Sequence, residues 1–141
     1  MKKILLILGF IGITIAVAFA RGTDVPQVVK TKFQTLYKDV KKVSWDKEGT
    51  SYEAEFTYKK IATSVLFDAQ GNVLETEKAI KFADLPKAAK DYLAKNKAGL
   101  KISETSIITD AKNKITYEAE VKGKDVIFDE QGNFIQEKES D

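Results

Sequence analysis

Residues 52–56 read Tyr-Glu-Ala-Glu-Phe, and residues 117–121 read Tyr-Glu-Ala-Glu-Val. A second shared motif follows each stretch: Phe-Asp-Ala-Gln-Gly-Asn at 67–72 and Phe-Asp-Glu-Gln-Gly-Asn at 128–133. Self-similarity at a nearly fixed spacing is the mark of an internal repeat. The chain therefore contains one structural unit twice, and this duplication decides the fold.

The first stretch has the pattern of a half-buried strand, because residues 52–59 alternate between apolar and polar side chains. A two-residue hairpin loop after Tyr58 would place Glu53 opposite Leu66 and Glu55 opposite Ser64. The apolar positions of the two strands then meet on the other face. In the second copy, the same arrangement places Glu118 opposite Ile127 and Glu120 opposite Asp125.

Each copy also has a helix ahead of its strands. The helices begin with Asp24-Val25-Pro26 and Asp84-Leu85-Pro86, where the aspartate is expected to cap the helix and the proline to lie in its first turn. Four short strands joined by tight turns follow each helix. We therefore predict an α+β fold of two tandem helix-plus-four-strand repeats, residues 21–80 and 81–141. Together they would form one compact domain, a curved antiparallel sheet with two helices packed on one face.

The first twenty residues have the pattern of a secretory signal peptide. Lys2 and Lys3 precede an apolar run, and Ala18-Phe19-Ala20 is a small-x-small cleavage site. The apolar run is short for a membrane-spanning helix, which needs about 20 residues. We expect cleavage near Ala20, no membrane association afterwards, and a periplasmic or secreted location.

The composition excludes several classes of function. The sequence has no His and no Cys, which removes Ser-His-Asp and Cys-His catalysis, His- or Cys-based metal sites and thiol chemistry. The net charge of +2 is accounted for by Lys2 and Lys3, so the exported part is formally neutral and has no footprint for nucleic acid. No cofactor is expected.

Two uses of carboxylates were considered. Glu53 and Glu55 share one face of a strand, a spacing compatible with a glycosidase pair, but a general acid needs a desolvated site and this face is expected to be open to water. Asp68 and Asp129 suggest a calcium loop, but a hairpin turn alone explains Asp followed by Gly. No metal site is therefore predicted.

The polar face of the sheet is the predicted binding surface, because apolar side chains lie there beside carboxylates. Trp45 is expected to point to the opposite face and to belong to the core, and the alternative is a surface anchor for a partner. The candidate binding residues are Glu53, Glu55, Ser64, Leu66, Glu118, Glu120 and Ile127.

The repeated order of helix-starting Pro, Trp45, Tyr-x-Ala-Glu-Phe and Phe-Asp-x-x-Gly resembles the PepSY-like, β-lactamase-inhibitor-like family of small exported bacterial proteins. The second copy departs from it: Ile107 or Ile108 lies near the Trp position, and Val121 replaces Phe56. The resemblance implies a curved sheet with a binding or inhibitory role at its open face.

The sequence thus predicts a non-catalytic, exported binding protein, one version of which inhibits or modulates an exported hydrolase. The expected partner is another exported protein, and the oligomeric state is left open. The alternative is a small-ligand or calcium-binding module, and an enzyme is the third hypothesis.

Overall fold

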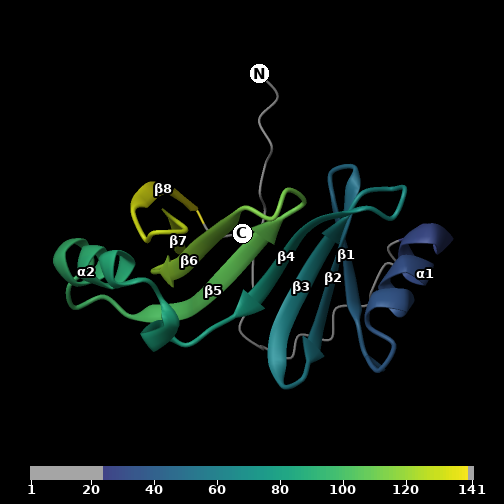
Figure 1. The fold of residues 1–141 in the computed structure, drawn as a ribbon, viewed down its shortest axis with the longest axis horizontal. Helices are drawn as coiled ribbons and strands as arrows, with labels where there is room; N and C mark the ends of the chain where they lie inside the picture. Colours follow the sequence, from purple (N-terminus) through teal and green to yellow (C-terminus); the bar gives the residue numbers. More distant parts are fainter. Residues whose placement is uncertain (1–23, 140–141) are drawn as a thin grey trace.

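The computed structural model describes residues 24–139. Each repeat is a helix followed by four strands, and the sheet order follows the chain from β1 to β8 with every neighbouring pair antiparallel. Helices α1 and α2 lie toward opposite ends of the sheet (Figure 1). The elements are α1 (Gln27–Leu36), β1 (Ser44–Glu48), β2 (Ser51–Tyr58), β3 (Ile61–Phe67), β4 (Val73–Ala79), a 3₁₀ turn (Phe82–Asp84), α2 (Lys87–Asn96), β5 (Ile102–Asp110), β6 (Ile115–Val121), β7 (Lys124–Asp129) and β8 (Phe134–Glu139).

The strand register predicted for the first hairpin is confirmed. Tyr58 pairs with Ile61, and the pairing continues through Ala54–Val65 to Tyr52–Phe67. The two loop residues, Lys59 and Lys60, both have positive φ, which is the conformation of a type I′ hairpin turn. The second hairpin repeats this arrangement.

Two hydrophobic clusters, one for each repeat, lie under the two helices. Val29 and Phe33 of α1 pack on Ala54 and Phe67, while Ala89 and Leu93 of α2 belong to the matching cluster. Trp45 is half-buried and packs edge-on against Phe33, with 5.5 Å between ring centroids. Both clusters lie on the same face of the sheet, so burial of apolar surface holds both helices there.

The predicted aspartate caps are wrong. Pro26 and Pro86 occupy the N-cap positions, and neither helix has a side-chain cap. Asp24 precedes the N-cap residue of α1 by two positions and makes no capping hydrogen bond. Asp84 instead closes the 3₁₀ turn by accepting a hydrogen bond from the Lys81 amide at 3.3 Å.

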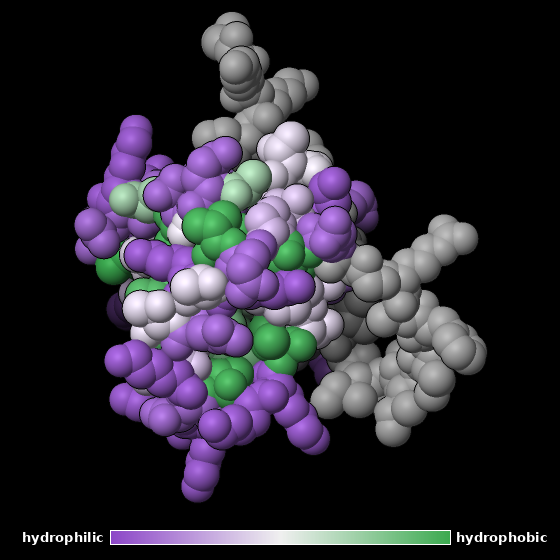
Figure 2. Space-filling model, turned by 90° about the vertical axis from the view of Figure 1, so that its right-hand side faces the viewer, coloured by the Kyte–Doolittle hydropathy of each residue, from purple (hydrophilic) through white to green (hydrophobic). Residues whose placement is uncertain are grey.

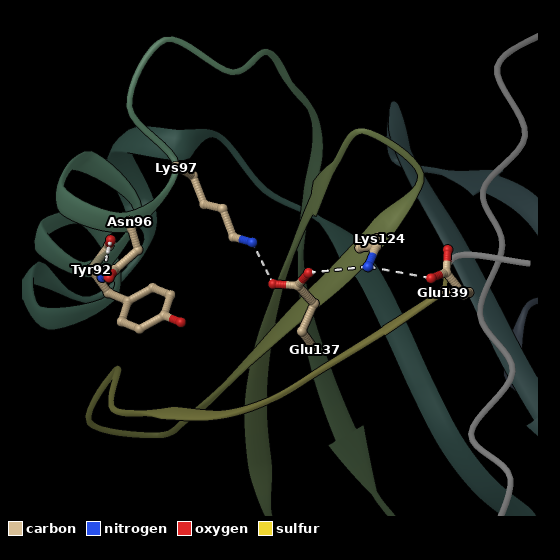
Figure 3. A network of polar contacts seen from close by, with 6 residues as sticks. All are labelled: Tyr92, Asn96, Lys97, Lys124, Glu137 and Glu139. Carbon is tan, nitrogen blue, oxygen red and sulfur yellow. Dashed lines mark hydrogen bonds and ion pairs between the residues drawn. The ribbon is translucent and has the colours of Figure 1, made fainter.

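The second helix is also tied to the last strand by charge. Lys97, which follows α2, forms an ion pair with Glu137 of β8, and Glu137 also faces Lys124 of β7 at 3.6 Å (Figure 3). In the first repeat Tyr37 stands at the place of Lys97, and its hydroxyl approaches Thr76 of β4. The two repeats therefore keep the same helix-to-strand contact with different chemistry.

The linker between the repeats explains why the second copy lacks a tryptophan. Trp45 pairs with Ala54, and the residue that pairs with the equivalent Ala119 is Thr105. The expectation that Ile107 or Ile108 holds this position is therefore wrong. Thr105 Oγ1 donates a 2.7 Å hydrogen bond to the Ile80 carbonyl, and the Ile80 amide donates to the Thr105 carbonyl at 2.9 Å. A tryptophan there would occupy the space that the linker uses.

Candidate functional site

The face of the sheet away from the helices carries most of the chemistry of this molecule. The register places Glu53 and Glu55 of β2 beside Ser64 and Leu66 of β3, as predicted. Glu118 of β6, with Glu120, lies on the same face in the second repeat, paired with Ile127 and Asp125 of β7. The structure thus brings the predicted site residues of both repeats to one surface. We define the glutamate face as Glu53, Glu55, Ser64, Leu66, Glu75, Glu77, Glu104, Ser106, Glu118, Glu120, Asp125, Ile127 and Lys138.

Five members of this face were not identified from the sequence. Glu75 and Glu77 come from β4, whose faces are hard to assign because a β-bulge shifts the register between Leu66 and Phe67. The others are Glu104, Ser106 and Lys138. The alternation of Glu75 and Glu77 around Thr76 was the available signal for β4.

The expectation that this face is open to water is wrong. Glu77 is 3% exposed, Glu75 4%, Glu53 5% and Glu118 7%. The sheet curves toward this face, since Lys138 on β8 acts electrostatically on Glu75 of β4, four strands away in the sheet order. Neighbouring side chains on a curved sheet shield one another, and the carboxyl groups are therefore largely removed from water.

Burial gives these carboxyl groups unusual protonation behaviour. Desolvation raises the pKa of Glu53, Glu75 and Glu77 to about 7, and adjacent carboxylates add to the rise. It raises the pKa of Glu104 to about 7 as well, with Glu120 contributing. The effect is largest for Glu118, whose pKa rises to about 9 because it is buried and faces Glu77 and Asp125.

Lys138 is the one basic side chain that the register places on the glutamate face, within the residues 24–139. Its Nζ lies 3.4 Å from Asp125 Oδ2, and its charge opposes the rise in the pKa of Glu75 and of Glu118. One ammonium group cannot neutralise the carboxyl groups around it. The face therefore carries a large excess of acidic groups.

Two carboxylate oxygens at the centre of this face, Glu77 Oε2 and Glu118 Oε2, are buried and have no hydrogen-bond partner among the described residues. Ser106 lies between them: its side chain interacts with Glu77, and its backbone pairs directly with Glu118. The three residues lie on the adjacent strands β4, β5 and β6. We call them the Glu77–Ser106–Glu118 triad. Leaving buried polar groups unpaired costs about 1–3 kcal/mol each, so a partner for them would contribute strongly to binding.

Glu53 and Glu55 form the pair that was compared with a glycosidase. Burial supplies the desolvation that the sequence interpretation considered missing: it raises the pKa of Glu53 to about 7 and also raises that of Glu55.

The aspartate turns are structural. Asp68 Oδ1 accepts hydrogen bonds from the amides of Gln70 at 2.9 Å and Asn72 at 2.8 Å, and its Oδ2 accepts one from the Asn72 side chain at 2.7 Å. Asp129 is held in the same way by Gln131 and Asn133. These bonds lower the pKa of both aspartates. Among residues 24–139 no group of three or more Asp or Glu side chains has a geometry that could hold a metal ion.

A pocket of about 620 Å³ lies at the junction of the repeats. Its walls include Ile80, Phe82 and Ile102, with Glu104 and Thr105 beside them. The small side chain of Thr105 at the Trp45 position contributes to this opening.

The surface seen from the side of α1 offers no comparable site. Figure 2 shows hydrophilic residues over most of this view, with hydrophobic residues in small separate patches. In the described part of the chain no helix is long and apolar enough to cross a membrane. The signal peptide predicted for residues 1–20 lies outside the described residues.

A duplicated helix-and-strand unit that forms one open antiparallel sheet defines a class of small α+β folds. The chain belongs to the β-lactamase-inhibitor-like, PepSY-like family, whose family model matches residues 18–59 and 50–136. The resemblance drawn from the repeated motifs is thereby confirmed. No curated protein matches the chain.

Solved structures of similar fold come from Bacteroides species. A periplasmic protein from Bacteroides eggerthii DSM 20697 has a TM-score of 0.75 and 13% identity, over 84% of this chain and 90% of that one. A DUF2874 family protein from Bacteroides uniformis ATCC 8492 has a TM-score of 0.72 and 19% identity, over 81% and 88%. A BLIP-like protein from Bacteroides fragilis NCTC 9343 has a TM-score of 0.66 and 22% identity, over 84% and 89%. At these identities the likeness shows a shared fold.

Proposed function

We propose that this protein is a non-catalytic, exported binding protein that docks another exported protein on its glutamate face. The observation that carries the proposal is the burial of same-sign carboxyl groups from both repeats on one continuous surface. A surface of this kind is costly to maintain, because each buried carboxyl group opposes ionisation of the next. A bound partner that compensates these groups gives the arrangement a use.

Export is supported by the signal-peptide pattern and by the description of the Bacteroides eggerthii relative as periplasmic. Inhibition of an exported hydrolase is one form that docking could take, and the family description supports it. The sequence has no His and no Cys, which removes Ser-His-Asp and Cys-His catalysis and supports a role without catalysis.

Site-specific photo-crosslinking in the producing cell tests this function. A benzophenone side chain is introduced at Glu120, which is half-buried on the glutamate face, or at Val28, which is 51% exposed on α1. We expect a discrete adduct with another exported protein from position 120 and none from position 28. Adducts of equal yield from both positions, or none from position 120, would count against docking on this face.

A further inference from the structure

We propose that the partner presents a basic, extended polypeptide segment to the glutamate face, and that a lysine or arginine side chain of this segment enters the Glu77–Ser106–Glu118 triad. This inference rests on the proposed function and specifies the chemistry of the partner.

Charge complementarity is the first reason. Carboxyl groups come to this face from β2, β4, β5, β6 and β7, and the register brings Lys138 as the basic counterpart within residues 24–139. Electrostatic complementarity of this kind selects partners of the opposite sign and accelerates their association. An acidic or purely apolar partner would leave the buried carboxyl groups uncompensated.

The triad is the second and independent reason. Glu77 and Glu118 are more than nine-tenths buried, each has a carboxylate oxygen without a hydrogen-bond donor from the described residues, and Glu77 acts electrostatically on Glu118. Ser106 lies on the strand between them, and its hydroxyl interacts with the Glu77 carboxyl group. Two acceptors beside a hydroxyl suit an ammonium or guanidinium group, which carries several N–H donors.

A metal ion fits the same place poorly. Calcium takes six to eight oxygen ligands, and no described group of three or more carboxylates has the geometry to hold a cation. A basic side chain needs fewer acceptors and brings its own donors. The chemistry therefore favours a protonated amine or guanidinium over a bare ion.

The extent of the face indicates a polypeptide rather than a single small cation. From β2 to β7 the sheet crosses five strand spacings of about 4.8 Å each, or roughly 24 Å if it were flat. An extended segment of about seven residues covers this span. Its central basic residue would reach the triad, while flanking basic residues would face Glu53 with Glu55 on one side and Glu120 with Asp125 on the other.

The test uses the mature protein and a fluorescein-labelled octa-arginine peptide, with octa-glutamate and a Gly-Ser peptide of equal length as references. Binding is measured by fluorescence anisotropy at neutral pH, at low and at physiological salt. The double variant Glu77→Gln with Glu118→Gln replaces the two triad carboxyl groups, which an entering cation would ionise, by neutral amides of nearly the same shape. The control variant Asp39→Asn with Glu130→Gln makes the same carboxyl-to-amide change at two exposed positions away from the face.

We expect octa-arginine to bind the native protein and the references not to bind. The triad variant should weaken octa-arginine binding about tenfold or more, because it removes buried acceptors that contact the bound cation directly. The control should bind nearly as the native protein does, because exposed charges away from the face contribute little to the affinity. If both variants weaken binding equally, octa-arginine is held by non-specific electrostatic attraction to the whole protein, and the inference is overturned. Failure of octa-arginine to bind the native protein would overturn it as well.

A second measurement does not depend on the folding of any variant. Octa-arginine is titrated into the native protein, and backbone amide chemical shifts are followed by NMR. The amides of Ser106 and Glu118 should move more than those of Lys32 and Ala88 on the helices. If the helix amides move as much, the inference is wrong. A crosslinked partner at position 120 would still support docking if the arginine peptide failed, so the two proposals can fail separately.

Discussion

Gly132 lies directly beneath Pro86. A Cβ atom on Gly132 would stand 2.6 Å from Pro86 Cβ and 2.9 Å from the Ala89 amide nitrogen, far inside contact distance. Gly132 also has a backbone φ of +86°, a conformation that residues other than glycine rarely adopt. In the second repeat the helix-starting proline and the Asp-x-x-Gly turn are therefore parts of one contact, whereas in the first repeat Gly71 lies against the backbone of Val28.

We predict that Gly132→Ala lowers the free energy of unfolding by about 2–4 kcal/mol, the sum of a strained φ and an overpacked helix contact. Gly123→Ala is the matched control, because Gly123 has φ of +71° and nothing within 4 Å of its added Cβ. It should cost about 1 kcal/mol. Chemical denaturation measures both, and equal losses would refute the contact with Pro86.

The pH dependence of stability follows from the glutamate face. The folded-state pKa of Glu53, Glu75, Glu77 and Glu104 rises from 4.5 to about 7, and that of Glu118 rises to about 9. The folded protein thus binds these protons more tightly than the unfolded chain. This contribution is complete below the unfolded pKa and is lost as the pH rises through 7 toward 9.

Aspartates of the turns act in the opposite direction at low pH. Asp68 and Asp129 have lowered pKa values, so their contribution is present above 3.8 and is lost as the pH falls through their folded pKa. We therefore predict a maximum of the melting temperature in mildly acidic solution and a decline toward alkaline pH. Calorimetry over this range checks the profile, and a maximum at alkaline pH would contradict it.

Glu118→Gln should flatten the alkaline side of that profile. Glutamine stays neutral at every pH, so the variant lacks the stabilisation that ionisation of the exposed Glu118 carboxyl group gives to the unfolded chain of the native sequence. At pH near 8 we expect a gain of about 1–3 kcal/mol in the free energy of unfolding, since each unit of pKa shift corresponds to about 1.4 kcal/mol. Glu130→Gln, at an exposed turn position, should leave the profile unchanged. An equal gain for both variants would show that Glu118 is not specially buried.

The hydroxyl of Thr105 ties the linker to the second repeat. Thr105→Val removes the 2.7 Å bond to the Ile80 carbonyl at nearly constant volume, and we expect a loss of about 1 kcal/mol. Thr35→Val removes a comparable hydroxyl bond to the Thr31 carbonyl on the exposed surface of α1 and should cost less. Urea denaturation measures the free energy of unfolding of both variants. If Thr105→Val leaves it unchanged, the hydrogen bond to Ile80 does not stabilise the fold.

The two repeats are proposed to unfold as one domain. β4 and β5 pair over five residues on each strand, so the sheet continues from one repeat into the other. Trp45 is the sole tryptophan of the chain, and its fluorescence reports on the first repeat. Its unfolding curve should coincide with that of far-ultraviolet circular dichroism, also in Gly132→Ala. Separate midpoints would show that the repeats unfold independently.

Much of the fold could be predicted because its signals are local. The alternation of residues 52–59 and the turn chemistry of Asp68 with Gly71 depend on nearby residues, and together they fixed the register of the first hairpin. Because the second copy shares these motifs, the same register could be predicted for the second hairpin, and the structure has it.

The burial of the candidate site could not be predicted in the same way. Glu53 and Glu118 look like solvent-exposed residues of a one-sided sheet, because alternation reports the face of a strand and not the curvature of the sheet. Lys138 acts electrostatically on Glu75 only when β8 curves toward β4. That interaction depends on all the intervening strands and has no local signature.

Charge reversal on the glutamate face is the decisive test of whether a partner protein docks there. Glu55→Arg with Glu120→Arg changes two half-buried positions, one in each repeat, and Asp39→Arg with Glu130→Arg is the control at exposed positions. The partner obtained by crosslinking is titrated against each protein after circular dichroism has shown equal melting. We expect the variant with arginines at positions 55 and 120 to lose its affinity for the partner, and the control variant to keep the native affinity. Binding of the face variant with native affinity would contradict docking on the glutamate face.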